Sequence, residues 1–164
     1  GYSGGGKSMI AEYESEQRSP LLDAPRMYGL TQQHKHLKEM CAVTGLAHAP
    51  VFLPIVGDFY SGMQVTVPLP ESQCKASRAE IEKIYRSTYN DAVIRWDAHM
   101  EQDGFLSALT LSGRDDMRVG LMGADERLIA AAQYDNLGKG ASGAAIECMN
   151  LALGLSDYEG LVLA

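Results

Sequence analysis

The sequence predicts an α+β fold in which helices flank a mixed, mainly antiparallel sheet. Its strand-like segments are grouped between helical ones, without the strand–helix alternation that builds parallel sheets. All six prolines lie in the first 70 residues, so we expect turns and interrupted strands there and longer elements afterwards. The 164 residues, 46% of them hydrophobic, suffice for one domain with a sizeable core.

Three helices are expected. The clearest covers residues 77–90, where Ser77 and Glu80 fit a capping box and apolar side chains then recur at helical spacing. Two further segments, 33–44 and 141–153, carry apolar residues at helical spacing and are each followed by a glycine that can end a helix.

Strands are expected in five places. Residues 63–67 alternate apolar and polar side chains, which is typical of a half-buried strand and leaves one apolar face that needs a cover. The other predicted strands are 93–96, 105–111, 117–122 and 128–134, the last with three alanines that also suit a helix. The first segment, residues 1–25, is expected to pack poorly.

The charge and the cysteine content argue against several classes of function. The net charge is −7 without a stripe of Lys or Arg, which argues against a nucleic-acid or anionic-membrane surface. No apolar run reaches the roughly 18 residues of a membrane span, and no basic-plus-apolar leader supports secretion. The cysteines form no paired motif, which favours a reducing compartment, and we expect a cytoplasmic location.

The opening GYSGGGKS matches the phosphate-loop pattern at its fixed positions, Gly1, Gly6, Lys7 and Ser8. In such a loop, backbone N–H groups would cradle phosphates and the lysine would reach the terminal ones. The three glutamates that follow make a poor helix beside phosphates. We therefore favour a flexible glycine turn over a nucleotide-binding loop.

His34 and His36 are candidates for chemistry, with Glu39 close by in the sequence. A His-x-His pair on a strand can bind one metal ion, but on a helix the two side chains face different ways. Because there is no second compact ligand pair, no metal is expected. The histidines then remain either surface residues or acid/base groups, since imidazole titrates near neutrality.

Residues 136–145, NLGKGASGAA, open the final helix with small side chains. Exposed N–H groups at a helix start form an anion site, to which Ser142 and Lys139 could add hydrogen bonds and charge. The alternative is close helix packing through the small residues, with Ser142 or Asn136 capping the helix. The residues alone leave both interpretations open.

Several segments together resemble one family. They are residues 1–7, Tyr28 with the block HKHLKE at 34–39, residues 52–63, and KGASGAA at 139–145 running into CMNLALGL at 148–155. In this order they are similar to the N-acetyl-γ-glutamyl-phosphate reductases, NADPH-dependent enzymes of arginine biosynthesis that form a semialdehyde.

This resemblance implies that residues 1–164 are a single catalytic and dimerisation domain with a carboxy-terminal helix, like that of glyceraldehyde-3-phosphate-dehydrogenase-like semialdehyde dehydrogenases. It implies a homo-oligomer, a dimer or tetramer. The amino-terminal NADP-binding Rossmann domain is absent, and no cysteine follows Pro-Gly as the family's nucleophile does. The fragment is therefore expected to be inactive alone. Lys38 is another departure, because the family commonly has proline there.

The resemblance also implies roles for particular residues. An absent cysteine would form a thioester from the acyl phosphate, hydride from NADPH would reduce it, and His36 would be the acid/base group with support from His34, Tyr28 and Glu39. Ser3, Lys7 and Arg26 are candidates for binding the substrate; Lys7 and Arg26 are candidates for its carboxylate on the ground of their charge alone. Candidates for contact with NADP are Asn136, Lys139, Gly140, Ala141, Ser142 and Gly143.

Two alternatives stay open. One is a sister acyl-phosphate reductase of the same architecture, acting on aspartyl phosphate or on a carrier-linked aminoadipyl phosphate. The other is a non-catalytic dimerisation or ligand-binding module, which is what an isolated domain would be.

Overall fold

A computed structural model of the chain describes residues 1–163, which form two compact units. The sheet unit contains Gly1, Ser3 and the residues from Tyr60 onward. The amino-terminal unit contains Tyr2 and the residues from Gly4 to Phe59. The single domain that the sequence predicts stays a prediction, and the two units are described separately.

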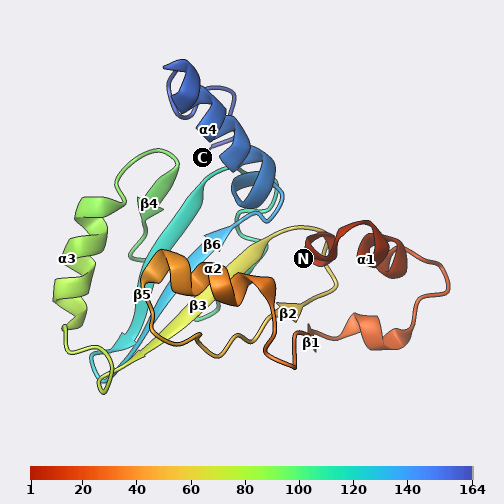
Figure 1. Cartoon of the computed structure of the whole chain (residues 1–164), viewed down its shortest axis with the longest axis horizontal. Helices are drawn as coiled ribbons and strands as arrows, with labels where there is room; N and C mark the ends of the chain where they lie inside the picture. The colour runs from red at the N-terminus through yellow and green to blue at the C-terminus, as the bar shows by residue number, and fades with distance from the viewer. Residues whose placement is uncertain (164) are drawn as a thin grey trace. The chain divides into compact units, whose positions relative to one another are not determined.

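The sheet unit is built on a four-stranded sheet with the strand order β3-β6-β5-β4 (Figure 1). Antiparallel pairs join β3 (Met63–Pro70) to β6 (Arg127–Tyr134) and β6 to β5 (Met117–Ala124). The short β4 (Ile94–Trp96) runs parallel to β5. The predicted mixed, mainly antiparallel sheet is therefore confirmed, and β3 accommodates two prolines because it lies at the edge.

Helix α3 (Arg78–Thr88) covers part of one face of this sheet. The predicted capping box is present: Ser77 Oγ accepts from the Glu80 N–H at 3.3 Å, and the Glu80 carboxylate accepts from the Ser77 N–H at 2.8 Å. Ile81 on the inner side of α3 packs into the main core with Leu121, Leu128 and Ala130.

The chain after β6 forms a π-helical turn, η3 (Gly138–Ser142), that continues into α4 (Gly143–Leu153). The predicted helix at 141–153 is thus confirmed, and it ends at Gly154 in the left-handed conformation, with φ of 69°. The buried Asn150 amide of α4 donates to the carbonyls of Asp157 and Glu159, which holds the following segment against the helix.

The strand predicted at residues 105–111 is wrong. These residues form turns, preceded by one isolated bridge between Gln102 and Phe105. The Ser107 hydroxyl accepts from the Leu109 N–H, and the Ser107 carbonyl accepts from the Thr110 hydroxyl. Such local bonds from Ser and Thr compete with a sheet ladder, which explains why the apolar pattern does not become a strand here.

The amino-terminal unit contains α1 (Gly6–Tyr13), α2 (Lys35–Thr44) and a two-stranded antiparallel ladder of β1 (Arg26–Met27) and β2 (Ile55–Val56). The 3₁₀ turn η2 (Pro20–Asp23) and most of the 3₁₀ turn η1 (Tyr2–Gly5) complete the regular structure of this part, while Ser3 of η1 belongs to the sheet unit. The helix predicted at 33–44 is confirmed as α2.

Most of residues 1–25 are exposed, in line with the expectation that this segment packs poorly, but the segment does contribute to a small core. Tyr13 and Leu22 are buried together with Val56 in a small core, on which Tyr2 and Met9 pack. The sequence pattern hides this core because its members are spread along irregular segments rather than placed on one periodic face.

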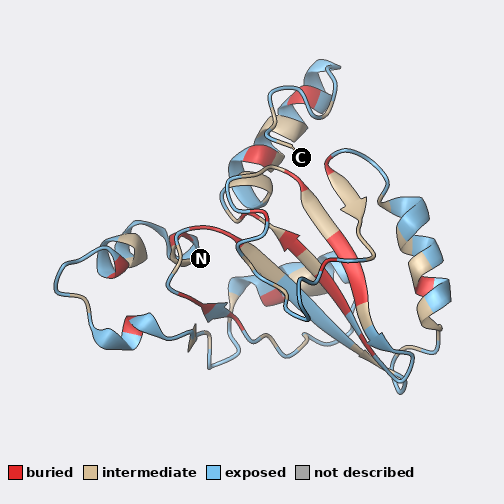
Figure 2. Cartoon of the chain, turned by 180° about the vertical axis from the view of Figure 1, so that it is seen from behind, coloured by how far each residue is buried: buried red, intermediate tan, exposed pale blue. Residues whose placement is uncertain are grey.

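Burial is uneven across the sheet. Figure 2 shows buried residues on the central strands β5 and β6, whereas the middle of the edge strand β3, residues 65–68, is exposed. Within residues 1–163 we find no helix with the length and apolar character that a membrane crossing requires.

Candidate active site

The histidine block lies at the start of α2. His34 is the residue that caps this helix: its Nδ1 accepts a hydrogen bond from the His36 N–H at 3.3 Å. The bond requires an unprotonated Nδ1 on His34, so this ring has a structural task at the helix start.

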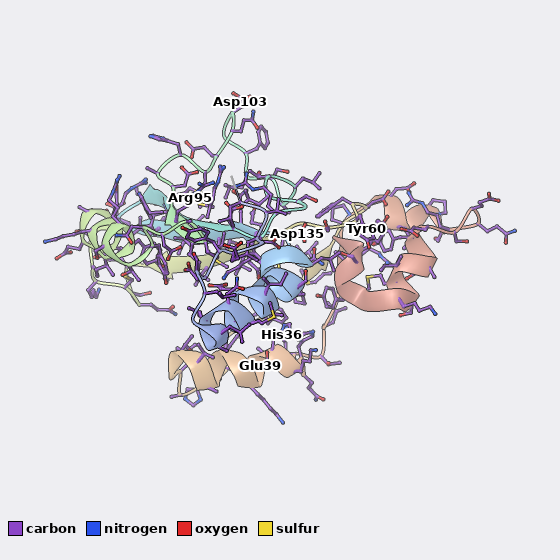
Figure 3. The ribbon with its side chains drawn as sticks, turned by 90° about the horizontal axis from the view of Figure 1, so that it is seen from above. His36, Glu39, Tyr60, Arg95, Asp103 and Asp135 are labelled. Carbon is purple, nitrogen blue, oxygen red and sulfur yellow. The ribbon has the colours of Figure 1, made fainter. Side chains whose placement is uncertain are left out.

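His36 and Glu39 lie one turn apart on α2 (Figure 3), with 3.9 Å between His36 Nε2 and Glu39 Oε2. Their side chains are 46% and 68% exposed, respectively. The carboxylate is placed to stabilise a protonated imidazole, while the exposure leaves the ring open to a reactant. This pair has the parts of a general acid/base group.

Aromatic rings surround the two imidazoles. The His34 ring lies 4.6 Å from that of His36, 6.1 Å from that of Tyr28 and 5.1 Å from that of Phe52, between centroids. The structure therefore brings together His36, His34, Tyr28 and Glu39. Phe52, 6.3 Å from the His36 ring, was not among the expected site residues, although it opens one of the segments that carry the resemblance.

The expected substrate residues are divided between the two units. Arg26 donates from Nε and Nη2 to the hydroxyl of the buried Tyr13 at 3.3 and 3.2 Å, and its Nη1 lies 3.6 Å from Glu12. The Arg26 guanidinium is thus already paired within the amino-terminal unit. Lys7 is exposed in the first turn of α1, whereas Ser3 belongs to the sheet unit.

In the sheet unit, Ser3 contacts the segment that follows β6. The Asn136 amide donates from Nδ2 to Ser3 Oγ at 2.9 Å, and its Oδ1 accepts from the Gly62 N–H at 2.9 Å. An expected substrate residue and an expected cofactor residue are therefore bonded directly to each other.

Asp135, which the sequence did not single out, anchors this region (Figure 3). The carboxylate is 1% exposed and accepts four hydrogen bonds of 2.7 to 2.9 Å, from Ser61 Oγ and from the N–H groups of Gly113, Leu137 and Gly138. Burial raises the pKa of this carboxyl, but the four donors outweigh burial and hold the pKa below its ordinary value. An aspartate three residues before the first residue of η3 was the available signal.

The helix start after Asp135 has few free donors. The N–H groups of Gly140 and Ser142 bond to the carbonyls of Asp135 and Leu137, and the Ser142 hydroxyl donates to Leu137 as well. Because Asp135 takes the N–H groups of 137 and 138, the chain's own carboxylate is the anion at this helix start.

The small residues pack closely here, but the expected cap is wrong: neither Ser142 nor Asn136 makes a side-chain cap bond at this helix start. A Cβ atom on Gly138 would overlap the Arg114 carbonyl, and one on Gly143 would overlap the Asp115 carboxylate. Lys139 forms an ion pair with Glu147, and the two side chains are 10% and 20% exposed. The lysine charge is therefore neutralised within the unit.

The exposed residues of η3, at this helix start, are small. Gly140, Ala141 and Ser142 are exposed and small, while the polar atoms nearest to them are paired internally. The contact of these three residues with NADP stays a prediction. Among residues 1–163, no group of three or more His, Cys, Asp or Glu side chains is arranged to hold a metal ion.

The fold and these clusters define a class of protein. Residues 1–136, which include the edge strand β3 and the strands β4, β5 and β6 of the mixed sheet, match the model of the family described as "Semialdehyde dehydrogenase, dimerisation domain". The chain belongs to this family.

The individual relatives carry a more specific name than the family description does. The chain is 41% identical to "N-acetyl-gamma-glutamyl-phosphate reductase 2" of Nostoc sp., over 98% of this chain and 54% of the relative. It is 42% identical to the N-acetyl-gamma-glutamyl-phosphate reductase of Sinorhizobium medicae, over 93% of this chain and 52% of the relative. The chain is 38% identical to the enzyme of the same name from Brucella ovis, over 94% of this chain and 52% of the relative. The chain thus spans about half the length of the curated relatives it matches.

Proposed function

We propose that this chain is the catalytic and dimerisation part of an NADPH-dependent reductase that converts N-acetyl-γ-glutamyl phosphate into N-acetylglutamate 5-semialdehyde and phosphate in arginine biosynthesis. The observation that carries the proposal is the 41% identity to a reductase of that name across 98% of the chain. The three cysteines are free, which agrees with a location in the reducing cytoplasm.

In the proposed reaction, a cysteine thiolate elsewhere in the parent protein attacks the acyl carbon, and phosphate leaves. NADPH supplies a hydride when bound. The thioester carbon takes that hydride and its oxygen takes a proton, which gives a hemithioacetal. The hydroxyl then returns this proton to the acid/base group as the C–S bond breaks, so that the thiolate leaves and the aldehyde forms. This chain has to supply the proton transfers and the surfaces that hold the reactants.

His36 is the proposed acid/base group. Its Nε2 first holds the proton of the attacking thiol and later delivers a proton to the developing oxyanion. Glu39, 3.9 Å from that nitrogen, stabilises the imidazolium that exists between the two steps. His34 and Phe52 fix the ring from the side, at centroid distances of 4.6 and 6.3 Å.

The proposed contact with NADP is the exposed surface of Gly140, Ala141 and Ser142. Asn136 and Lys139 support this surface through their internal partners, Ser3 and Glu147, rather than through free charge. Most of the cofactor affinity is then expected from the half of the parent protein that this chain does not contain.

A homo-oligomer is the proposed assembly. Val65 and Val67 lie on the same face of β3 as Leu69, which packs against the main core, yet they are 41% and 49% exposed. Strand β3 is also an unpaired sheet edge. A second copy that covers these two valines would remove both the exposed apolar side chains and the unpaired sheet edge. Val67→Lys in the parent protein should then shift sedimentation toward the monomer.

The test of activity uses the full-length parent protein. Reduction of NADP⁺ should require both N-acetylglutamate 5-semialdehyde and phosphate, and omission of phosphate should abolish it. Faster turnover of aspartate semialdehyde would instead favour the sister reductase. The chain alone should show no turnover, and measurable turnover by it would contradict the division of labour proposed here.

A further inference from the structure

Three segments that are far apart in the sequence meet at the Asp135 carboxylate. Its Oδ2 accepts from Ser61 Oγ and from the Gly113 N–H, both at 2.7 Å. Its Oδ1 accepts from the N–H groups of Leu137 and Gly138, at 2.7 and 2.9 Å. Ser61 Oγ lies a further 3.0 Å from Ser112 Oγ, so the hydroxyls extend the network toward the turn at 112–113.

One of these segments contacts an expected site residue, and another leads into the proposed cofactor surface. The Ser3 N–H donates to the Tyr60 carbonyl at 3.0 Å, so the segment 60–62 holds the Ser3 backbone while Asn136 holds its hydroxyl. Leu137 and Gly138 begin the loop that presents residues 140–142. A single carboxylate therefore sets the position of both parts.

Asp135 itself is 1% exposed and its four acceptor bonds are made within the chain. A group that is enclosed in this way can act only through the residues it holds. A carboxylate is also the one common side chain that can accept at both oxygens from four donors without presenting a donor of its own.

We infer that Asp135 is a positioning residue of the reductase: it fixes the loop 137–143 against the segment 60–62, and thereby places the proposed cofactor surface relative to Ser3. This inference rests on the proposed function for the identity of the ligand. The hydrogen bonds themselves do not depend on it.

The test compares Asp135→Asn and Ser61→Ala in the full-length protein. The asparagine places an NH₂ group against donors that need an acceptor, whereas the alanine removes only one of the four bonds and keeps the carboxylate. Hydrogen exchange should accelerate at least about tenfold in peptides covering 137–142 and 112–114 for Asp135→Asn. The dissociation constant for NADP⁺ should rise about tenfold and kcat/KM should fall about 10²-fold. Ser61→Ala should change each quantity in the same direction but less.

Ser77→Ala is the matched control. It removes a hydroxyl from the cap of α3, far from the carboxylate in the sequence and in its contacts, and should lower Tm while the NADP⁺ dissociation constant stays within about twofold. A merely structural role for Asp135 would give this same pattern and would overturn the inference, as would wild-type NADP⁺ affinity in Asp135→Asn. Failure of the proposed function would show separately, as absent turnover in the wild-type protein.

Discussion

The Asn136 amide donates to the Ser3 hydroxyl at 2.9 Å across 133 residues of sequence. The same amide accepts from the Gly62 N–H, so one side chain joins the first residues of the chain, the start of β3 and the end of β6. Ser3 is 5% exposed, and its hydroxyl is therefore committed to this junction rather than to solvent.

A double-mutant cycle should measure this junction. Ser3→Ala should cost about 1 kcal/mol in the free energy of unfolding, and Asn136→Ala about 2–3 kcal/mol, because the second variant also leaves the Gly62 N–H without an acceptor. The coupling energy from urea unfolding of the two single variants and the double variant should be about 0.5–1.5 kcal/mol. Strict additivity would show that the two side chains do not support each other.

Acid should weaken the sheet unit through Asp135. The four hydrogen bonds hold its pKa below the ordinary value of 3.8, so the ionised carboxylate stabilises the folded state above that value. The contribution is lost as the pH falls through the folded-state pKa. The difference in unfolding free energy between wild type and Asp135→Asn should therefore be constant above about pH 5 and shrink below about pH 4. A difference that grows toward acid would contradict this sign.

Much of the fold could be predicted because its signals are local. The capping box at Ser77 and the glycines after α2 and α4 mark helix ends by chemistry that acts within a few residues. The alternation in β3 likewise indicates a half-buried strand. The turns at 105–111 were missed because Ser107 and Thr110 satisfy the backbone locally, which an apolar pattern does not reveal.

The site was predictable to a lesser degree. The block from His34 to Glu39 is local in sequence, and the structure groups it with Tyr28 and Phe52. The role of Asp135 depends instead on contacts with Ser61 and Gly113, which are distant in sequence. Lys139 looked like a free charge because its partner, Glu147, lies two helical turns onward.

Two substitutions after β6 should show which glycine is closely packed and which has room for a side chain. Gly138→Ala should destabilise the protein by about 1–3 kcal/mol, because the new methyl group overlaps the Arg114 carbonyl. Gly140→Ala is the matched change in the same turn, where a Cβ atom would lie 3.1 Å from the Asp135 carbonyl, and should cost less. Thermal unfolding of both variants measures the difference. Equal losses would mean that the loop adjusts freely at Gly138.

The two histidines of α2 should differ sharply in the full-length enzyme. His36→Asn should lower kcat by roughly 10²–10⁴-fold, the usual range for loss of a general acid/base group, with a modest change in KM for the substrate. His34→Asn should cost much less, because asparagine can replace the Nδ1 acceptor that caps the helix. Glu39→Gln should fall between them, since it removes the charge 3.9 Å from Nε2 but leaves the imidazole. Steady-state kinetics and far-UV circular dichroism on the three variants distinguish lost proton transfer from lost helix. A crippling His34→Asn with a nearly silent His36→Asn would reverse the assignment, and two silent variants would remove α2 from the proposed mechanism.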